Sequence, residues 1–387
     1  MARLKIGIAG RPNAGKSTLF SALTGIKVDI ADYAFTTVQP NVGLSYIMER
    51  CPEGEIGRKC SPREGFCRNG MRAVPVEVVD VPGLIEGASQ GKGMGNEFLD
   101  ALRNSDAIIN LFDGTSVRGG KERLAAQAEE VEREIVTWFA DRMARDWERF
   151  SRRADASGER IERSLHTKLA SFGLSEADIS TCLSKGVFPQ RLSIWGADDF
   201  HEFAGEVFRS VKPIVRVANK GDLLSDGEIR EVREALPGCD VISADYELTL
   251  TRAFNLGIIS STDTSFDVSG RANSRQAEAL ETIRSAFRSG RLKRAGEILR
   301  AVAKERLRRI VVYPVQDETH WTDSQGNVLP DALMVPEGTT ALDLAYMIHT
   351  EIGDGFIRAI DGRTKRALGK EHELRDGDVV KIVSRAK

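Results

Sequence analysis

The hydrophobic pattern of this 387-residue chain alternates between short apolar runs and longer segments with helical spacing. The apolar runs Leu4–Ala9, Val74–Val79, Pro213–Ala218 and Cys239–Ile242 each end in a polar loop. Short apolar runs bounded by turn residues are typical of buried strands. The pattern therefore predicts an α/β fold with a mostly parallel, doubly wound sheet whose strand ends carry polar residues.

A surplus of residues separates the second and third apolar runs. Two strand–helix–strand steps need roughly 60 residues, and the interval from Asp80 to Asn219 exceeds this by roughly 80. Within it, apolar residues recur every three or four positions in two seams: Leu124, Ala128, Val131, Ile135 and Trp138, then Ile161, Leu165, Leu169 and Phe172. This spacing is typical of helices with one apolar face. We therefore expect an antiparallel helical hairpin at 118–205, inserted into a sheet domain at 1–117 and 206–270.

The last part of the chain, 310–387, has a pattern of its own. A helix at Ala341–Glu351, capped by Thr340, lies among four strand-like runs: Ile310–Val315, Ala332–Val335, Phe356–Ile360 and Val379–Val383. One helix on a small mixed sheet is the arrangement of a β-grasp domain. We expect residues 271–309, which precede it, to form a basic helical segment.

A glycine-rich loop follows the first predicted strand. It reads Gly10-Arg11-Pro12-Asn13-Ala14-Gly15-Lys16-Ser17-Thr18 and leads into a helix-forming run. In such a strand–loop–helix unit, backbone N–H groups and the positive helix end bind phosphates, the lysine reaches the β- and γ-phosphates, and the serine hydroxyl ligates Mg²⁺. The loop therefore predicts a nucleotide site that uses Lys16 and Ser17.

Polar residues at two later strand ends narrow the class of nucleotide. Asp80 and Gly83 follow the second run, where an aspartate holds a Mg²⁺-bound water and a glycine N–H meets the γ-phosphate. Asn219, Lys220 and Asp222 follow the third run. Because each motif lies at a strand end and in the order of a GTPase, we favour ligand binding over ordinary turn residues.

The motif after the third run is expected to select the base. The Asp222 carboxylate can accept hydrogen bonds from N1–H and the 2-amino group of guanine, whereas adenine offers neither donor. Asn219 would contact the base edge and tie back to the phosphate loop, while the Lys220 stem covers the ring face. Ser243 and Ala244 would direct a backbone N–H at guanine O6. The sequence therefore predicts a guanine nucleotide.

Two threonines lie between the phosphate loop and Asp80, where a loop that senses the γ-phosphate belongs. One of Thr36 and Thr37 should reach Mg²⁺ in the triphosphate state and release it after hydrolysis, and we favour Thr37. The alternative is an ordinary strand that contains two β-branched residues.

Together these residues resemble the motifs of the Obg-related GTPases, most closely the YchF-type branch in its archaeal form. The matching stretches are Gly10–Phe20, Tyr33–Thr37, Gln39–Gly43, Gly83–Ala88, Gly91–Asn96 and Leu99–Asp113. The segment from about Ile310 is similar to the TGS domain that these proteins carry. The resemblance implies that Thr37 is the Mg²⁺ threonine and that Asn13 can also bind a potassium ion.

The chain departs from this family at two positions. Ala34 stands where the family usually has proline, so the sensing loop is expected to be less rigid. Many YchF-type proteins carry a glutamate in the base-reading motif and prefer ATP, whereas Asp222 is intact here. We therefore favour GTP over ATP.

The residue after Gly83 bears on the hydrolysis step. Leu84 stands where many GTPases have a glutamine that orients water, and an apolar side chain cannot do this. Hydrolysis would then depend on Mg²⁺, the loop N–H groups and an Asn13-bound potassium ion, with Lys16, Thr37 and Gly83 as the catalytic residues. We expect slow turnover, on the order of 10⁻² s⁻¹ or below.

Composition sets limits on partners and compartment. The net charge is −2, so the overall balance favours no particular partner. No run approaches the roughly 18 apolar residues of a membrane span, and the N-terminus enters a strand without a secretory signal. An odd number of cysteines, five, indicates a reducing compartment. We expect a cytoplasmic monomer that does not contact membranes.

Three of the cysteines, Cys51, Cys60 and Cys67, lie in a polar loop rich in glycine and proline. Three thiolates can bind zinc, but these spacings are long and no fourth ligand is evident nearby. The favoured interpretation is that they are surface-loop cysteines without a ligand role.

Residues 291–309 carry eight basic side chains against Glu297 and Glu305. Arg300, Lys304 and Arg308 repeat every four positions, so a helix would present them on one face. A basic amphipathic helix in a nearly neutral protein favours contact with a phosphate backbone, and we expect these three to contact RNA. The alternative is a helix face that only contacts solvent. Contact with a membrane surface is the least favoured interpretation.

The sequence thus predicts a GTP-binding protein that hydrolyses GTP slowly to GDP and phosphate. As a nucleotide-dependent switch it would act on the ribosome or another RNA-containing translation complex. Two other hypotheses stay open. One is a YchF-type ATPase in stress regulation, and the other is a non-catalytic adaptor in which the nucleotide orders a surface for a protein partner.

Overall fold

The computed structural model describes residues 3–26, 41–81, 104–263 and 265–385. The chain divides into two compact units. The first unit comprises Lys5–Gly43 and Val78–Ala295, and the second comprises Met1–Leu4, Leu44–Glu77 and Gly296–Lys387. The division passes through two long strands, β2 (Asn41–Arg50) and β4 (Met71–Asp80).

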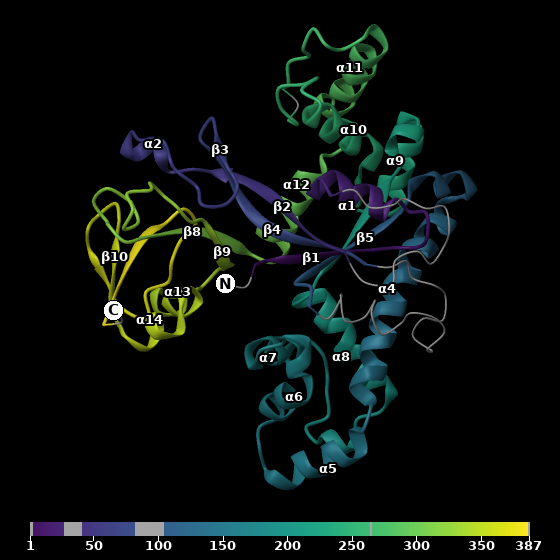
Figure 1. The fold of residues 1–387 in the computed structure, drawn as a ribbon. Helices are drawn as coiled ribbons and strands as arrows, with labels where there is room; N and C mark the ends of the chain where they lie inside the picture. The colour runs from purple at the N-terminus through teal and green to yellow at the C-terminus, as the bar shows by residue number, and fades with distance from the viewer. Residues whose placement is uncertain (1–2, 27–40, 82–103, 264, 386–387) are drawn as a thin grey trace. The chain divides into compact units, whose positions relative to one another are not determined.

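A largely parallel sheet forms the centre of the first unit (Figure 1). Four neighbouring strands run parallel: β1 (Lys5–Ala9), β5 (Ala107–Asp113), β6 (Ile214–Asn219) and β7 (Asp240–Val241). The full strand order is β2-β4-β1-β5-β6-β7, and β3 (Cys67–Arg68) pairs antiparallel with β4. The predicted fold class is therefore confirmed. Because parallel strands end at the same sheet edge, the loops after β1, β5 and β6 meet there.

Helices pack on this sheet and bury its apolar side chains. They include α1 (Lys16–Thr24), α9 (Asp226–Ala235) and α10 (Ala244–Asn255), with short 3₁₀ turns η2 (Gly114–Gly119) and η5 (Gly221–Leu223). The helix α11 (Ser274–Arg288) lies beyond α10 (Figure 1) and contributes to the same core. Capping boxes at Ser225 and Asn273 start α9 and α11, and such caps contribute about 1 kcal/mol each. Phe112, Ala218 and Ile283 belong to one continuous core.

The segment between β5 and β6 forms five helices. They are α4 (Lys121–Ala144), α5 (Trp147–Ser157), α6 (Ile161–Leu169), α7 (Glu176–Lys185) and α8 (Ala197–Ser210), with 3₁₀ turns η3 (Ala170–Phe172) and η4 (Leu192–Ile194). Figure 1 shows α7 beside α8, α6 next to α7, and α5 at the end of this segment that is farthest from the sheet. Within the described residues, no helix is long and apolar enough to cross a membrane.

The predicted single hairpin is too simple for this insertion. Most of its seam residues are buried as expected: those from Leu124 to Trp138 lie on α4, and Leu165 and Leu169 lie on α6, whereas Ile161 is partly buried. However, Arg145 is extended and Asp146 is left-handed (φ 54°), so α4 ends and α5 begins there. The aromatic core includes a stack of Trp147 on Trp195, with ring centroids 5.7 Å apart. Apolar spacing identified the inward side chains but not the helix breaks.

The second unit contains a five-stranded sheet with the order β11-β10-β12-β8-β9. The strands are β8 (Arg309–Val315), β9 (Leu333–Pro336), β10 (Phe356–Asp361), β11 (Ala367–Leu368) and β12 (Val379–Ser384). β8 and β12 are parallel and the other pairs are antiparallel. The predicted helix and small mixed sheet are confirmed, although the helix divides at His349 into α13 (Ala341–Ile348) and α14 (Thr350–Asp354). The short helix α2 (Glu53–Ile56) also lies in this unit.

The predicted basic helix differs from the structure in length and in its exposed face. Of the predicted segment 271–309, α11 covers the first part, and within 291–309 only α12 (Ala295–Ala301) and a π turn (Val302–Arg306) are helical. Arg308 lies beyond them with left-handed backbone (φ 49°), so it does not continue a face begun by Arg300 and Lys304.

All three of these basic side chains are paired with carboxylates. Arg300 contacts Glu49 at 2.9 Å, Lys304 contacts Asp376 at 2.6 Å, and Arg308 contacts Glu337 at 2.9 Å. The expectation that one helix face presents all three is therefore wrong, because the helix ends before Arg308, and each of the three has an acidic partner.

Candidate nucleotide-binding site

The phosphate loop lies between β1 and α1, and its backbone shape depends on glycine. Gly10 (φ 154°) and Gly15 (φ 94°) both have positive φ. A Cβ atom on Gly15 would lie 2.2 Å from Asn219 Nδ2, and one on Gly10 would lie 2.1 Å from the Leu111 carbonyl oxygen. Only glycine fits at these positions. The two ends of the loop therefore pack directly against β6 and β5.

Lys16 is the first residue of α1, and it is only 8% exposed. Its Nζ atom donates a hydrogen bond of 2.9 Å to the Arg11 carbonyl oxygen. Burial lowers the pKa of Lys16 to about 8, and the charge of Asp80 offsets part of this effect. A buried ammonium group that bonds to a neutral carbonyl suits an anionic ligand, because the ligand's charge would stabilise it.

Ser17 and Asp80 meet beneath the loop. The Ser17 hydroxyl donates to Asp80 Oδ2 at 3.0 Å, and Asp80 is buried at the end of β4. Burial raises the pKa of Asp80, while the Ser17 hydrogen bond and the Lys16 charge lower it in part. A hydroxyl and a carboxylate are the hard oxygen donors that Mg²⁺ prefers. This pair therefore fits a magnesium ion held next to the phosphates.

Asn219 joins three motifs that are far apart in the sequence. Its side-chain Nδ2 donates to the Ala14 carbonyl oxygen at 2.8 Å, and its Oδ1 accepts from the Ala244 backbone N–H at 2.9 Å. Asn219 is buried at the end of β6. One amide thus links the phosphate loop, the base-reading motif and the last motif, as the sequence predicted for its tie to the loop.

The next residue, Lys220, reveals a contributor that the sequence reasoning missed. Lys220 has left-handed backbone (φ 63°), and its Nζ donates to Asp113 Oδ2 at 2.6 Å. Burial raises the pKa of Asp113, but hydrogen bonds from Lys220 and Thr115 outweigh it and hold this pKa below its usual range. Asp113 therefore positions the Lys220 stem. The sequence signal that could have indicated this role is an acidic residue at the end of the apolar run 107–113, followed by a glycine.

The remaining base-reading residues lie on the same side of the sheet. Asp222 is the middle residue of the turn η5, which begins directly after Lys220, and it is partly exposed. Ser243 is fully buried and its hydroxyl accepts from the Tyr246 N–H at 3.1 Å, which caps α10. The Ser243 side chain therefore supports the helix, and Ala244 directs its N–H to Asn219.

Other predicted residues have less defined surroundings. Arg11, Pro12 and Asn13 are exposed at the tip of the loop, and Thr18 lies on α1. The threonines Thr36 and Thr37, together with Gly83 and Leu84, lie outside the described residues.

This combination of sheet, phosphate loop and base-reading strand ends defines a P-loop GTPase. Residues 5–142 match a family model described as a 50S ribosome-binding GTPase. Residues 217–317 match the G4 motif-containing domain of the Obg-like GTPase YGR210-like model, and residues 325–384 match the TGS domain.

Three similar proteins extend this comparison. The GTP-binding protein MJ1332 of Methanocaldococcus jannaschii is 38% identical over 393 residues, or 99% of each chain. The crystal structure of a GTP-binding protein from Pyrococcus horikoshii OT3 has a TM-score of 0.75 and 32% identity, and the alignment covers 98% of this chain and 100% of that one. The ribosome-binding ATPase YchF of Haemophilus ducreyi is 32% identical over 222 residues, or 56% of each chain. The chain belongs to the Obg-related family of P-loop GTPases, which includes the YchF proteins.

Proposed function

We propose that this protein binds GTP and hydrolyses it slowly to GDP and phosphate, as a switch that acts on the ribosome or a translation-related RNA complex. The proposal depends most on two hydrogen bonds of the Asn219 side chain, one to the Ala14 carbonyl oxygen and one from the Ala244 N–H. They bring the phosphate-binding and base-reading motifs to one edge of the sheet. The base-reading carboxylate Asp222 follows three positions later, as guanine recognition requires.

The proposed site holds its phosphates through the loop from Gly10 to Thr18. Lys16 would exchange its bond to the Arg11 carbonyl for a phosphate oxygen. Mg²⁺ would be held by Ser17 directly and by Asp80 through water, with Thr37 as a further ligand. When bound, this ion would neutralise charge that develops on the phosphates.

Slow turnover follows from the residues available for catalysis. Lys16 and the loop N–H groups would stabilise transition-state charge, and Thr37 and Gly83 would contact the γ-phosphate end. Leu84 cannot orient the attacking water, so turnover on the order of 10⁻² s⁻¹ or below is expected. Asn13, exposed at the loop tip, is the proposed ligand for a potassium ion.

A ribosomal target is supported by the names of the matching model and of the YchF relative. That relative is named an ATPase, which makes ATP the second candidate substrate. Asp222 favours GTP, because its carboxylate would face no donor on adenine.

Competition against a fluorescent GDP analogue tests the choice of nucleotide. We expect GTP and GDP to displace the probe at concentrations at least about 100-fold below ATP. Asp222→Asn should abolish most of this preference, whereas the exposed Asp267→Asn, in the same unit, should leave it unchanged. Equal displacement by ATP and GTP in the unmodified protein would remove the guanine assignment.

Ribosome pelleting with a GTP analogue or GDP tests the switch. We expect pelleting to depend on the bound nucleotide and to weaken as salt rises. If Lys16→Ala retains full partner binding with either nucleotide, the protein is better described as a non-catalytic adaptor.

A further inference from the structure

Four potential metal ligands converge in the second unit. Cys51 directly follows β2, Glu53 begins α2, Cys60 lies in the following loop, and Cys67 begins β3. One ligand atom from each residue lies within 4.8 Å of all the others. The three cysteines are widely spaced in the sequence, but the loop folds back on itself and brings them together. The fourth ligand, a carboxylate two positions after Cys51, was overlooked.

The separation of two sulfur atoms matches that around a single ion. Cys51 Sγ and Cys60 Sγ are 3.7 Å apart. Tetrahedral zinc with Zn–S bonds of about 2.3 Å holds two sulfurs about 3.8 Å apart. A disulfide would require about 2.0 Å, so the structure holds these cysteines as free thiols. The distance between the two sulfur atoms is therefore that of two ligands of the same metal ion.

Glu53 is oriented toward the sulfurs by the backbone of the same loop. Its Oε2 accepts a hydrogen bond of 2.8 Å from the Cys60 N–H. The carboxylate is therefore bound to the segment that carries the second thiol. Ligating carboxylates are commonly fixed in this way.

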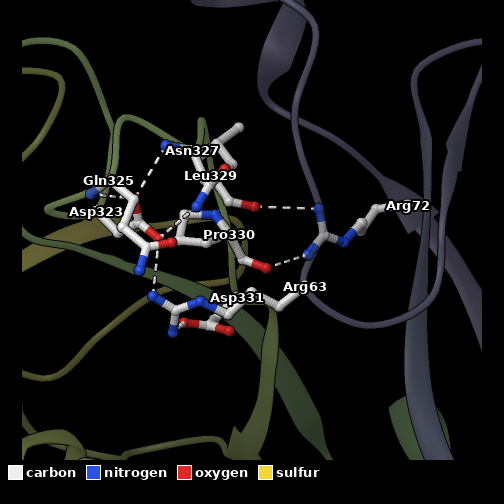
Figure 2. A network of polar contacts seen from close by, with 8 residues as sticks. All are labelled: Arg63, Arg72, Asp323, Gln325, Asn327, Leu329, Pro330 and Asp331. Atoms are coloured by element: carbon white, nitrogen blue, oxygen red, sulfur yellow. Dashed lines mark hydrogen bonds and ion pairs between the residues drawn. The ribbon is translucent and has the colours of Figure 1, made fainter.

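A buried arginine next to the cluster provides a second, independent observation. Arg72 is 1% exposed, and its Nη1 atom lies 3.6 Å from Cys60 Sγ. Figure 2 shows its guanidinium directed at the carbonyl oxygens of Leu329 and Pro330, at 3.1 and 2.9 Å. Its Nε atom has no hydrogen-bond partner among the described residues. A buried cation requires a nearby negative charge, and these carbonyls are neutral.

We propose that Cys51, Glu53, Cys60 and Cys67 bind one Zn²⁺ ion as a structural site. Three thiolates and one carboxylate around Zn²⁺ carry a net charge of about −2, which would supply the negative charge that buried Arg72 lacks, and Arg72 would offset about one unit of it. Thiolate ligands select zinc over magnesium or calcium. Four protein ligands leave no open position for substrate, so the site is structural.

The ion would fix the loop that lies against the C-terminal sheet. From this loop, the Ser61 N–H donates to the Val328 carbonyl at 2.8 Å, and the Arg63 N–H donates to the Pro330 carbonyl at 3.0 Å. The Arg63 side chain contacts Asp323 at 2.8 Å (Figure 2). Zinc binding would therefore hold the segment 51–67 in the shape that makes these contacts.

Elemental analysis of the full-length protein tests the proposal. After purification without chelator, we expect about one zinc ion per chain. Cys60→Ala and Cys67→Ala should reduce this to less than about a tenth. The matched control is Cys239→Ala, which removes a buried cysteine of the first unit and should retain full zinc. Zinc-free protein after refolding with excess zinc, or equal loss in the control, would overturn the proposal.

Cobalt substitution of the unaltered protein gives a readout that does not depend on variant folding. Co²⁺ in a tetrahedral site with three thiolates gives intense visible bands and thiolate charge-transfer absorption. We expect this spectrum, with one equivalent at saturation, and its loss on addition of zinc. A weak octahedral spectrum would overturn the proposal, as would a Cys51–Cys60 disulfide found by mass spectrometry in metal-free protein purified under reducing conditions.

Discussion

Lys16 makes nucleotide binding depend on pH in a defined direction. Because burial lowers its pKa to about 8, the free protein loses this proton as pH rises above about 8, whereas the unfolded chain keeps it to about 10.4. Between these values the unfolded state binds more protons, so this group makes the free protein more stable as pH rises. A bound triphosphate would restore the ammonium form, so affinity should fall with rising pH.

We expect proton uptake on GTP binding at about pH 8.5. Calorimetry in two buffers with different ionisation enthalpies measures it. Lys16→Arg is the control, because arginine remains charged throughout this range, and it should show no such uptake. Identical proton uptake in both proteins would assign the effect to another group.

Single residues differ in how far the sequence predicts their roles. The tie from Asn219 to the phosphate loop was predictable, because a motif gives its spacing and chemistry. Asp113 was not, since its role depends on the neighbouring strand that brings Lys220 within 2.6 Å. Glu53 was missed because a carboxylate on the protein surface is common, and only the fold shows that three sulfurs surround it.

At the scale of one element, the junction of the phosphate loop with α1 depends on the space beside Gly15. Gly15→Ala would place a methyl group 2.2 Å from Asn219 Nδ2 and break its bond to Ala14. Losing such a buried hydrogen bond costs about 1–3 kcal/mol, so we expect GTP affinity to fall at least about 10-fold.

A matched substitution separates this clash from backbone strain. Gly25, at the other end of α1, also has positive φ (72°), but a Cβ there meets nothing within 4 Å. Gly25→Ala should lower stability by about 1 kcal/mol and leave GTP affinity unchanged. Thermal denaturation and nucleotide titration of both variants provide the comparison. Equal loss of affinity in the two would assign the effect to α1 as a whole.

Helix and strand boundaries show the limit of sequence periodicity. The spacing of Leu124 through Trp138 gave the buried side of α4, because this property repeats with the helical period. The break at Arg145 and Asp146 and the π turn at Val302–Arg306 have no such signal. Local spacing also does not predict the ion pairs of Arg300 and Lys304, because their acidic partners lie far away in the sequence.

At the scale of the whole molecule, Arg72 joins segments of the second unit that lie more than 250 positions apart. Arg72→Met would leave the Leu329 carbonyl without a donor and the Pro330 carbonyl with the Arg63 N–H alone, at a cost of about 1–3 kcal/mol. We expect faster amide exchange at Ser61 and Arg63, whose N–H groups bond to the same C-terminal segment. The exposed Arg306→Met should change stability by less than about 0.5 kcal/mol. Unchanged exchange in Arg72→Met would show that the other contacts suffice.

The basic residues of the second unit differ in how far their charged groups are exposed, and therefore in whether they can contact RNA. Lys304 is 14% exposed and bonded to Asp376, whereas the Arg308 side chain is 76% exposed beside Glu337. A phosphate contact contributes about 0.7–0.9 to the slope of log affinity against log salt concentration. Arg308→Gln should therefore reduce the slope for ribosome binding by about one. Lys304→Gln should instead lower the free energy of unfolding and leave the slope unchanged, since its partner is a protein carboxylate. Equal slopes in all three proteins would place the RNA contact elsewhere on the molecule.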